Sequence, residues 1–297
     1  MLVIRTLLFA PGNNARRVEK ALNSNADAAI IDLEDSVPNA EKEATRPLVR
    51  QALSQGRRNL AYVRVNGLTT PWAFGDLKAV VCPQLDGIVL AKAESGEAVR
   101  LVDWLVGALE REAGMTRGRI DLIPLVETAR GLANAEEIAA ACPRVKHLAF
   151  GAGDYTTDLG INLSKEGTEI FYARSRLAAV SCAAGIDPPI DTVFLDIRDT
   201  EALTADACMA RRLGFQGKLV IHPDQVAPVN EAFTPGTEEV AQAQEIVNAF
   251  EQAEAQGVGA IQVGGRLVDY PIARHARRIL ALAEVAAKVA GGGPGHD

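Results

Sequence analysis

Short apolar runs rich in β-branched residues alternate with longer helical patterns along most of this chain, and this alternation constrains the fold more than any other feature. A strand, a helix and a second strand in succession build a parallel unit, because the helix carries the chain back to the start of the sheet. The runs span Thr6–Ala10, Ala28–Leu33, Leu60–Asn66, Asp86–Ala91, Asp121–Val126, Lys146–Phe150, Ile190–Leu195 and Lys218–Ile221. These repeats predict the α/β class and a closed (β/α)8, or TIM, barrel.

Helical patterns long enough for a crossover separate these runs. They span Asn14–Leu22, Ala40–Leu53, Ala73–Val80, Glu97–Glu112, Leu132–Ala141, Glu166–Ala183 and Thr200–Leu213. Glycine and proline punctuate the connections, as expected where helices end and turns begin. We therefore predict that residues 1–223 form a catalytic barrel domain.

The pattern changes after Pro223. Two further helical patterns, Glu238–Ala255 and Ile272–Val289, flank a glycine-rich stretch at Gly257–Gly265. Residues 224–297 are therefore predicted to form a C-terminal helical extension, with a flexible tail from about residue 291. The apolar faces of these helices need a surface to cover them, so we expect the extension to pack on a neighbouring subunit.

Composition excludes several classes of partner. The formal net charge of −7 lacks the basic excess that binding to nucleic acid requires. No run approaches membrane-spanning length, so no membrane partner is expected. The cysteines, Cys82, Cys142, Cys182 and Cys208, are too scattered for a disulfide framework or a thiolate metal site, and we expect buried thiols in a reducing compartment. The sequence predicts a cytoplasmic protein.

Two carboxylates, Glu127 and Asp154, follow consecutive strands of the predicted barrel. The active site of such a barrel lies at the carboxyl ends of its strands, so these side chains are expected side by side at the mouth. Mg²⁺ commonly takes one or two protein carboxylates and leaves its other positions to water and substrate, so two ligands are enough. The alternative is that each carboxylate caps the helix that follows it.

A charged residue, Arg64, interrupts a run that its flanking valines mark as buried. Alternation along the strand places Arg64 and Asn66 on the same side. A buried guanidinium needs a carboxylate partner, so Arg64 either clamps the carboxylate of a substrate or forms a structural ion pair with Glu34 or Asp35. Both roles are compatible, because a supporting carboxylate can orient a substrate-binding arginine.

Three other positions allow more than one interpretation. Arg16 and Lys20 belong to a basic cluster with Arg5 and Arg17 around the first helix, which could bind phosphate groups or could be a solvated helix face. His222 ends the last strand, but the sequence offers it no nucleophile partner, so a structural hydrogen bond is the better interpretation.

Several stretches, taken in order, resemble the citrate lyase beta subunit and malyl-CoA lyase family of the HpcH/HpaI aldolase superfamily. They are Arg5-Thr6-Leu7-Leu8-Phe9-Ala10-Pro11-Gly12, Ile31-Asp32-Leu33-Glu34-Asp35-Ser36-Val37, Val63-Arg64-Val65-Asn66, Leu125-Val126-Glu127-Thr128-Ala129-Arg130-Gly131, Gly151-Ala152-Gly153-Asp154-Tyr155, Ile221-His222-Pro223 and Gly265-Arg266-Leu267-Val268-Asp269. Each stretch is weak alone, whereas their order and spacing along almost the whole chain are specific.

This resemblance implies a lyase that cleaves a 3-hydroxyacyl thioester of coenzyme A or of an acyl-carrier protein into an acetyl thioester and a 2-oxo acid such as glyoxylate, pyruvate or oxaloacetate. It implies that Glu127 and Asp154 bind Mg²⁺, or Mn²⁺ in its place, and that Arg64 holds the oxo acid with support from Glu34 and Asp35. Arg16 and Lys20 would then bind the phosphates of the carrier.

The resemblance also implies that Asp269 reaches a neighbouring subunit's site as an acid or base, in a homotrimer or hexamer. Mg²⁺ suits the reaction as a Lewis acid, and an acid such as Asp269 can protonate the carbanion. From the sequence alone, Asp269 could equally be an N-cap, since Pro271 follows it closely.

Three rival functions remain open. A pyruvate-type aldolase of the same superfamily would act on a hydroxy-oxo acid without a thioester. The pattern typical of that branch has a histidine directly after the acidic pair, whereas this chain has Ser36 after Glu34 and Asp35. A Schiff-base aldolase could use Lys92 if burial lowers its pKa. A non-catalytic subunit of a lyase complex would not need Arg64, Glu127 and Asp154.

Overall fold

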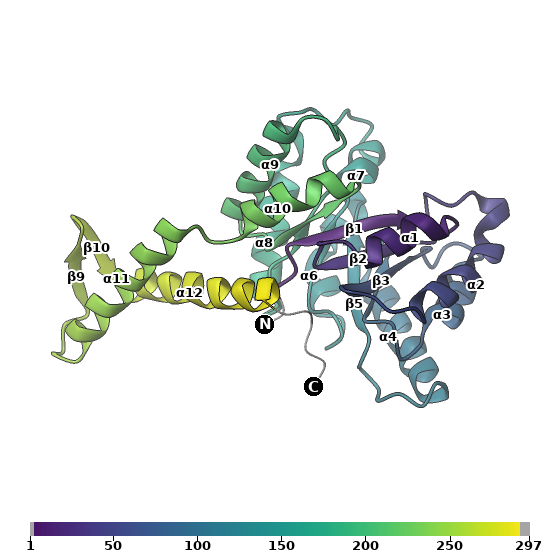
Figure 1. Cartoon of the computed structure of the whole chain (residues 1–297), viewed down its shortest axis with the longest axis horizontal. Helices are drawn as coiled ribbons and strands as arrows, with labels where there is room; N and C mark the ends of the chain where they lie inside the picture. The colour runs from purple at the N-terminus through teal and green to yellow at the C-terminus, as the bar shows by residue number, and fades with distance from the viewer. Residues whose placement is uncertain (1–2, 292–297) are drawn as a thin grey trace. The chain divides into compact units, whose positions relative to one another are not determined.

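Eight parallel strands, β1 to β8, close into a barrel in chain order, which confirms the predicted architecture (Figure 1). The computed structural model describes residues 3–291. The strands are β1 (Thr6–Pro11), β2 (Ala28–Asp32), β3 (Leu60–Val65), β4 (Gly87–Leu90), β5 (Asp121–Val126), β6 (Ala149–Phe150), β7 (Ile190–Asp191) and β8 (Gly217–Val220). The barrel closes where β1 pairs with β8.

Helices connect the strands and surround the barrel (Figure 1). They are α1 (Ala15–Leu22), α2 (Lys42–Leu53), α3 (Ala73–Val80), α4 (Gly96–Glu112), α5 (Ala129–Ala133), α6 (Ala135–Ala139), α7 (Ala152–Asp158), α8 (Phe171–Ala183), α9 (Thr200–Leu213) and α10 (Val226–Phe233). Several begin at a side chain that accepts a backbone N–H, as Ser95 does for α4 and Asp199 for α9. Among residues 3–291, no helix combines the length and apolarity needed to cross a membrane.

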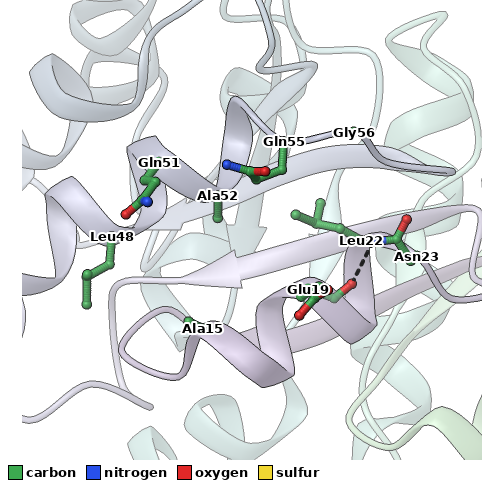
Figure 2. A pocket seen from close by; sticks show the side chains of 9 residues that line it. All are labelled: Ala15, Glu19, Leu22, Asn23, Leu48, Gln51, Ala52, Gln55 and Gly56. Atoms are coloured by element: carbon green, nitrogen blue, oxygen red, sulfur yellow. Dashed lines mark hydrogen bonds between the residues drawn. The ribbon is translucent and has the colours of Figure 1, made fainter.

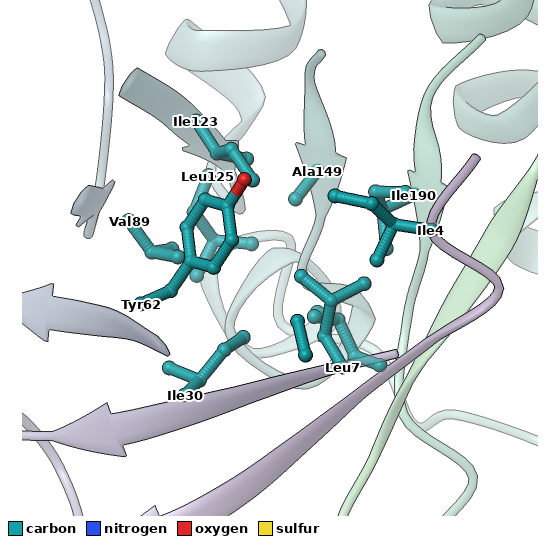
Figure 3. Close-up of a cluster of buried hydrophobic side chains, with 11 residues drawn as sticks. Ile4, Leu7, Ile30, Tyr62, Val89, Ile123, Leu125, Ala149 and Ile190 are labelled. Carbon is teal, nitrogen blue, oxygen red and sulfur yellow. The ribbon is translucent and has the colours of Figure 1, made fainter. Parts of the chain in front are cut away.

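Alternate residues of the strands fill the barrel interior, and Figure 3 shows these side chains pointing toward one another. The largest is Tyr62 on β3, which is fully buried. Its ring lies against Gly87 on the neighbouring strand β4, where an added Cβ would come within 2.1 Å of the ring carbon Cε1. The phenol hydroxyl donates to Asp121 at the start of β5, at 3.3 Å. A residue without a side chain at position 87 therefore makes room for the central aromatic ring.

Outside the barrel wall, a buried network of charges fixes helices α8 and α9 to strands β7 and β8. Lys218 Nζ lies 2.6 Å from both Asp191 and Asp206. Arg174 pairs with the same two carboxylates at 2.9 Å. Removing one partner would leave a buried charge uncompensated. The network therefore stabilises the packing of these helices on the strands.

The C-terminal segment is a separate compact unit that begins at Glu231, and the barrel unit spans Val3–Asn230. The helices of this C-terminal unit, α11 (Thr237–Glu254) and α12 (Tyr270–Gly291), pack on each other. An antiparallel hairpin of β9 (Ala260–Val263) and β10 (Arg266–Asp269) joins them. The apolar core of this unit includes Ala243, Val247, Phe250, Val268, Ala273 and Ala276.

Several local features differ from the predicted elements or were not predicted. The glycine-rich stretch forms the β9–β10 hairpin, because Gly264 and Gly265 adopt the positive φ angles that a tight turn requires. The pattern at Leu132–Ala141 divides into two helices at Asn134, whose amide donates to the Glu94 carbonyl. Helix α7 was not predicted, and its Gly151 and Gly153 explain why. The predicted tail residues 292–297 lie outside the described residues.

Strands β6 and β7 are shorter than predicted, at two residues each. Beyond Asp191 the chain leaves the sheet and makes side-chain contacts instead, because the Thr192 hydroxyl accepts the Ala152 N–H and the Phe194 carbonyl accepts the Gln225 amide.

The expectation of buried thiols holds for one cysteine and fails for the others. All four cysteines are free, but only Cys82 is buried. Cys182 is exposed, and Cys142 and Cys208 are partly exposed.

We predict that Gly87→Ala lowers the free energy of unfolding by about 3 kcal/mol, because the new methyl group displaces the Tyr62 ring from a filled interior. Urea denaturation would measure the change. Gly56→Ala is the matched control, since no atom lies within 4 Å of its added Cβ, and it should change stability by less than about 0.5 kcal/mol. Equal effects of the two substitutions would contradict the prediction.

Candidate active site at the barrel mouth

The apolar columns inside the barrel end in charged side chains. Ile30 on β2 is followed two residues later by Asp32, Tyr62 on β3 by Arg64, and Leu125 on β5 by Glu127. Because alternate residues of a strand share a face, these charges extend the same inward-facing columns to the mouth. The sequence pattern that fills the core therefore also assembles the site.

Asp32 and Arg64 form a bidentate ion pair between adjacent strands. They face each other in the register of β2 and β3. Arg64 Nε donates to Asp32 Oδ1 and Nη2 donates to Oδ2, both at 2.7 Å. The Phe9 ring lies 4.9 Å from the guanidinium carbon, close enough for a cation–π contact. Arg64 is thereby fixed in plane and direction.

Burial would raise the pKa of Asp32, but the hydrogen bonds and charge of Arg64 outweigh it and the pKa lies below its ordinary value. The N–H groups of Glu34 and Ser36 also donate to this carboxylate, so Asp32 holds the loop that follows β2. We expected Glu34 or Asp35 as the partner of Arg64. Glu34 is a second partner, with Oε2 at 3.0 Å from Nη1, and the principal partner is Asp32.

Asp35 lies away from Arg64, with its side chain 58% exposed and one oxygen 3.5 Å from Lys92 Nζ. Lys92 itself connects the acidic groups of the mouth. Its ammonium contacts Glu34 and lies 3.8 Å from Asp154, and its backbone N–H donates to Glu127 Oε1 at 2.7 Å.

Burial would lower the pKa of Lys92, but the carboxylates of Glu34, Glu127 and Asp154 outweigh it and raise the pKa. A Schiff-base aldolase needs a neutral amine as its nucleophile, and this environment favours the charged ammonium. The negative charges around Lys92 therefore argue against the Schiff-base reaction.

Glu127 is buried at the end of β5, and its carboxylate lies against Gly151. A Cβ at position 151 would come within 2.6 Å of Glu127 Oε2, so only glycine leaves room for this carboxylate. Burial raises the pKa of Glu127 well above its ordinary value, and the negative charges of Glu34 and Asp154 add to the rise against the opposing charges of Arg64 and Lys92. The positive charges of Arg64 and Lys92 therefore do not outweigh the effect of burial on this carboxylate.

Asp154 lies in the first turn of α7, and its side chain is 37% exposed. Glu127 and Asp154 thus combine a buried carboxylate that needs a cation with one that is open to solvent, which fits a divalent ion. Across residues 3–291, no group of three or more His, Cys, Asp or Glu side chains is arranged to hold a metal. A site here would rely on two carboxylates, with water and substrate at the other positions.

Two polar residues of the mouth have structural contacts. The buried Asn66 donates to the Leu33 carbonyl and to Asp76, which ties together the loops after β2 and β3. His222 caps the short turn Pro223–Gln225, where its Nδ1 accepts the Asp224 N–H at 3.3 Å. This is the structural interpretation that we favoured for His222.

Arg16 and Lys20 are exposed on α1. Arg5, another member of the expected basic cluster, is engaged elsewhere, because its guanidinium pairs with Asp27 at 2.8 Å. Between α1 and α2 lies a groove of about 420 Å³, drawn in Figure 2. Its lining comprises Ala15, Glu19, Leu22, Asn23, Leu48, Gln51, Ala52, Gln55 and Gly56.

Asp269 lies in the C-terminal unit, at the end of β10. Its Oδ1 accepts the Ile272 N–H in the first turn of α12, at 3.2 Å. This contact is that of a helix-capping aspartate, the alternative that the sequence left open.

Comparison with known proteins identifies the family. The family described as HpcH/HpaI aldolase/citrate lyase matches residues 5–223. The citrate lyase subunit beta of Leuconostoc mesenteroides subsp. cremoris is 38% identical over 282 residues, which cover 94% of this chain and 93% of that protein. This chain belongs to the HpcH/HpaI aldolase/citrate lyase family. The resemblance is thus confirmed, and with it the class of carbon–carbon lyases.

Two other members of the family extend the comparison. The L-malyl-CoA/beta-methylmalyl-CoA lyase of Rhodobacter capsulatus is 37% identical over 305 residues, which cover 95% of each chain. The crystal structure of CitE from Mycobacterium tuberculosis, in complex with magnesium, acetoacetate and coenzyme A, matches with a TM-score of 0.78 and 32% identity. It covers 95% of this chain and 98% of that one.

We predict that Arg64→Met lowers the free energy of unfolding by about 3 kcal/mol at neutral pH, because it leaves Asp32 as a buried charge without a counter-ion and removes one of the two cations that pair with Glu34. The ion pair lowers the pKa of Asp32, so its stabilisation is present above the ordinary value of 3.8 and is lost as the pH falls through the lowered pKa. The deficit of Arg64→Met should shrink on acidification.

A double-mutant cycle with Asp32→Asn, followed by urea denaturation, tests this pair. The double variant should be more stable than the sum of the single changes implies, because no unpaired charge remains. The exposed pair of Lys165 with Asp199 is the control, and Lys165→Met should cost much less stability than Arg64→Met, because solvent screens the pair. Strict additivity of the Asp32 and Arg64 substitutions would show that the pair is not coupled.

Proposed function

We propose that this chain is a Mg²⁺-dependent lyase that cleaves a 3-hydroxyacyl thioester, such as citryl-, malyl- or citramalyl-CoA or its acyl-carrier-protein equivalent, into an acetyl thioester and a 2-oxo acid. The observation that carries the proposal is the buried carboxylate of Glu127, which shares the barrel mouth with the open carboxylate of Asp154 and the fixed guanidinium of Arg64. The names of its relatives and the ligands of the M. tuberculosis protein support the choice of substrate class.

In this proposal, Glu127 and Asp154 hold Mg²⁺, with Mn²⁺ as a substitute. When bound, the ion acts as a Lewis acid that stabilises negative charge on substrate oxygens. Arg64 binds the carboxylate of the 2-oxo acid through the Nη donors that Asp32 does not use. Glu34 supports Arg64 directly, and Asp35 acts through Lys92.

The remaining groups act on the thioester. Arg16 in the first turn of α1 and Lys20 in its last turn are exposed cations, and we assign them to the phosphates of the carrier. Asp269 supplies the proton exchange at the carbanion, from the C-terminal unit of a neighbouring subunit in a homotrimer or hexamer. Release of the hydrogen bond to Ile272 would make its carboxyl group available.

We predict that Glu127→Gln and Asp154→Asn each abolish cleavage and that excess EDTA does the same to the unaltered protein, with recovery on addition of Mg²⁺ or Mn²⁺. The reason is that each amide removes a negative charge from a site with only two carboxylate ligands. Release of oxo acid from citryl-, malyl- and citramalyl-CoA is the measurement. The exposed Glu136→Gln is the matched control and should retain full activity. Full activity in chelator would exclude the metal mechanism.

A second prediction concerns the shared site. Mixed oligomers of Asp269→Asn and Glu127→Gln should regain part of the activity after subunit exchange, because some sites then contain both intact groups. Each variant alone, taken through the same exchange, is the control. A fully active monomer, or no recovery when labelled subunits have exchanged, would contradict a site shared between subunits.

A further inference from the structure

Lys92 has an unusual backbone conformation. Among residues 3–291 it is the one non-glycine residue with positive φ, at 50°. A side chain with a Cβ is disfavoured there, and glycine or asparagine adopts this conformation more easily. Such a conformation persists only where surrounding contacts enforce it, and it is frequent at functional sites. The contacts of Lys92 therefore indicate what the conformation achieves.

The positive φ lets Lys92 contact four carboxylates of the barrel mouth, one through its backbone N–H and three through its ammonium. The backbone N–H of Lys92 holds Glu127 at 2.7 Å, while its ammonium reaches Glu34, Asp35 at 3.5 Å and Asp154 at 3.8 Å. Within the described chain, Lys92 is the one ion-pair partner of Asp154. The cation that balances Asp154 is thus a residue of the protein itself.

We propose that Lys92 is the resident counter-ion of the metal site, which offsets part of the negative charge of Glu34, Asp35 and Asp154 in the metal-free protein and is displaced from Asp154 when a divalent cation binds. This inference rests on the proposed function, in that Glu127 and Asp154 are taken as the metal ligands. Asp154 cannot keep an ammonium as its close partner and also bind a metal without repulsion between the two cations. Lys92 keeps Glu34 and Asp35 as partners after it moves.

Because the metal displaces it, Lys92 has opposite effects on the stability of the metal-free protein and on the affinity for the metal. It stabilises the metal-free protein, because it separates carboxylates that would otherwise repel one another. It weakens metal binding, because the incoming ion must compete with it. A lysine that merely positioned the ligands would strengthen metal binding, so the sign of the change separates the two roles.

The test is Mn²⁺ binding followed by electron paramagnetic resonance of the free ion, together with the Tm of the metal-free protein. Lys92→Asn removes the charge and tolerates the positive φ. It should bind Mn²⁺ about tenfold more tightly than the unaltered protein. Its metal-free Tm should be lower, and the difference in Tm should shrink at saturating Mn²⁺. Lys92→Arg is the control, because it retains the positive charge, and its Kd should stay within about twofold.

Unchanged or weaker Mn²⁺ binding by Lys92→Asn would overturn the proposal while leaving the metal site intact. If Lys92→Asn does not fold, Lys92→Gly replaces it with the same expected change in Kd, since glycine also accepts this φ. Failure of Mn²⁺ to bind the unaltered protein, or equal binding by Glu127→Gln, would instead overturn the metal site of the proposed function and this inference with it.

Discussion

The ion pair of Asp32 with Arg64 is the interaction on which the barrel mouth depends. It joins adjacent strands at the last position where they are still paired, and it holds the loop after β2 through the N–H groups that Asp32 accepts. Because both groups are largely removed from solvent, neither can be lost without leaving the other uncompensated. The guanidinium therefore has a fixed direction before any substrate arrives, which is the preorganisation that catalysis requires.

The charges around this pair do not balance. Asp32, Glu34, Glu127 and Asp154 meet two cations, Arg64 and Lys92. Burial makes the surplus negative charge most unfavourable at Glu127, whose pKa rises accordingly. A folded protein keeps such an imbalance only where it is useful, and a surplus of oxygen ligands with negative charge is what a hard divalent cation binds. The electrostatics and the family membership thus support the same function.

The alternation of apolar runs and helices was sufficient to predict the barrel, because a closed parallel sheet leaves few ways to arrange eight such units. The strand ends pointed to Arg64, Glu127 and Asp154 as candidates and to Glu34 as a partner of Arg64, but the principal partner, Asp32, was missed. Asp32 stands opposite Arg64 through the register of β2 and β3, and register depends on tertiary packing rather than on either strand alone. The role of Lys92 was equally hidden, since its φ follows from contacts with distant residues. By contrast, the Gly264-Gly265 pair is typical of a two-residue hairpin turn, so the sequence alone was sufficient to predict the β9–β10 hairpin.

The shortness of β6 and β7 has a consequence for how the barrel opens. Two residues each give this sector few hydrogen bonds between strands, whereas β1 and β2 are paired along five positions. Local opening begins where the fewest bonds must break, so backbone amides of this sector should exchange with solvent before those of the opposite wall. The helix that carries Asp154 directly follows β6. The most easily loosened part of the wall is thus the part that carries Asp154, whereas Arg64 lies on β3, outside this sector.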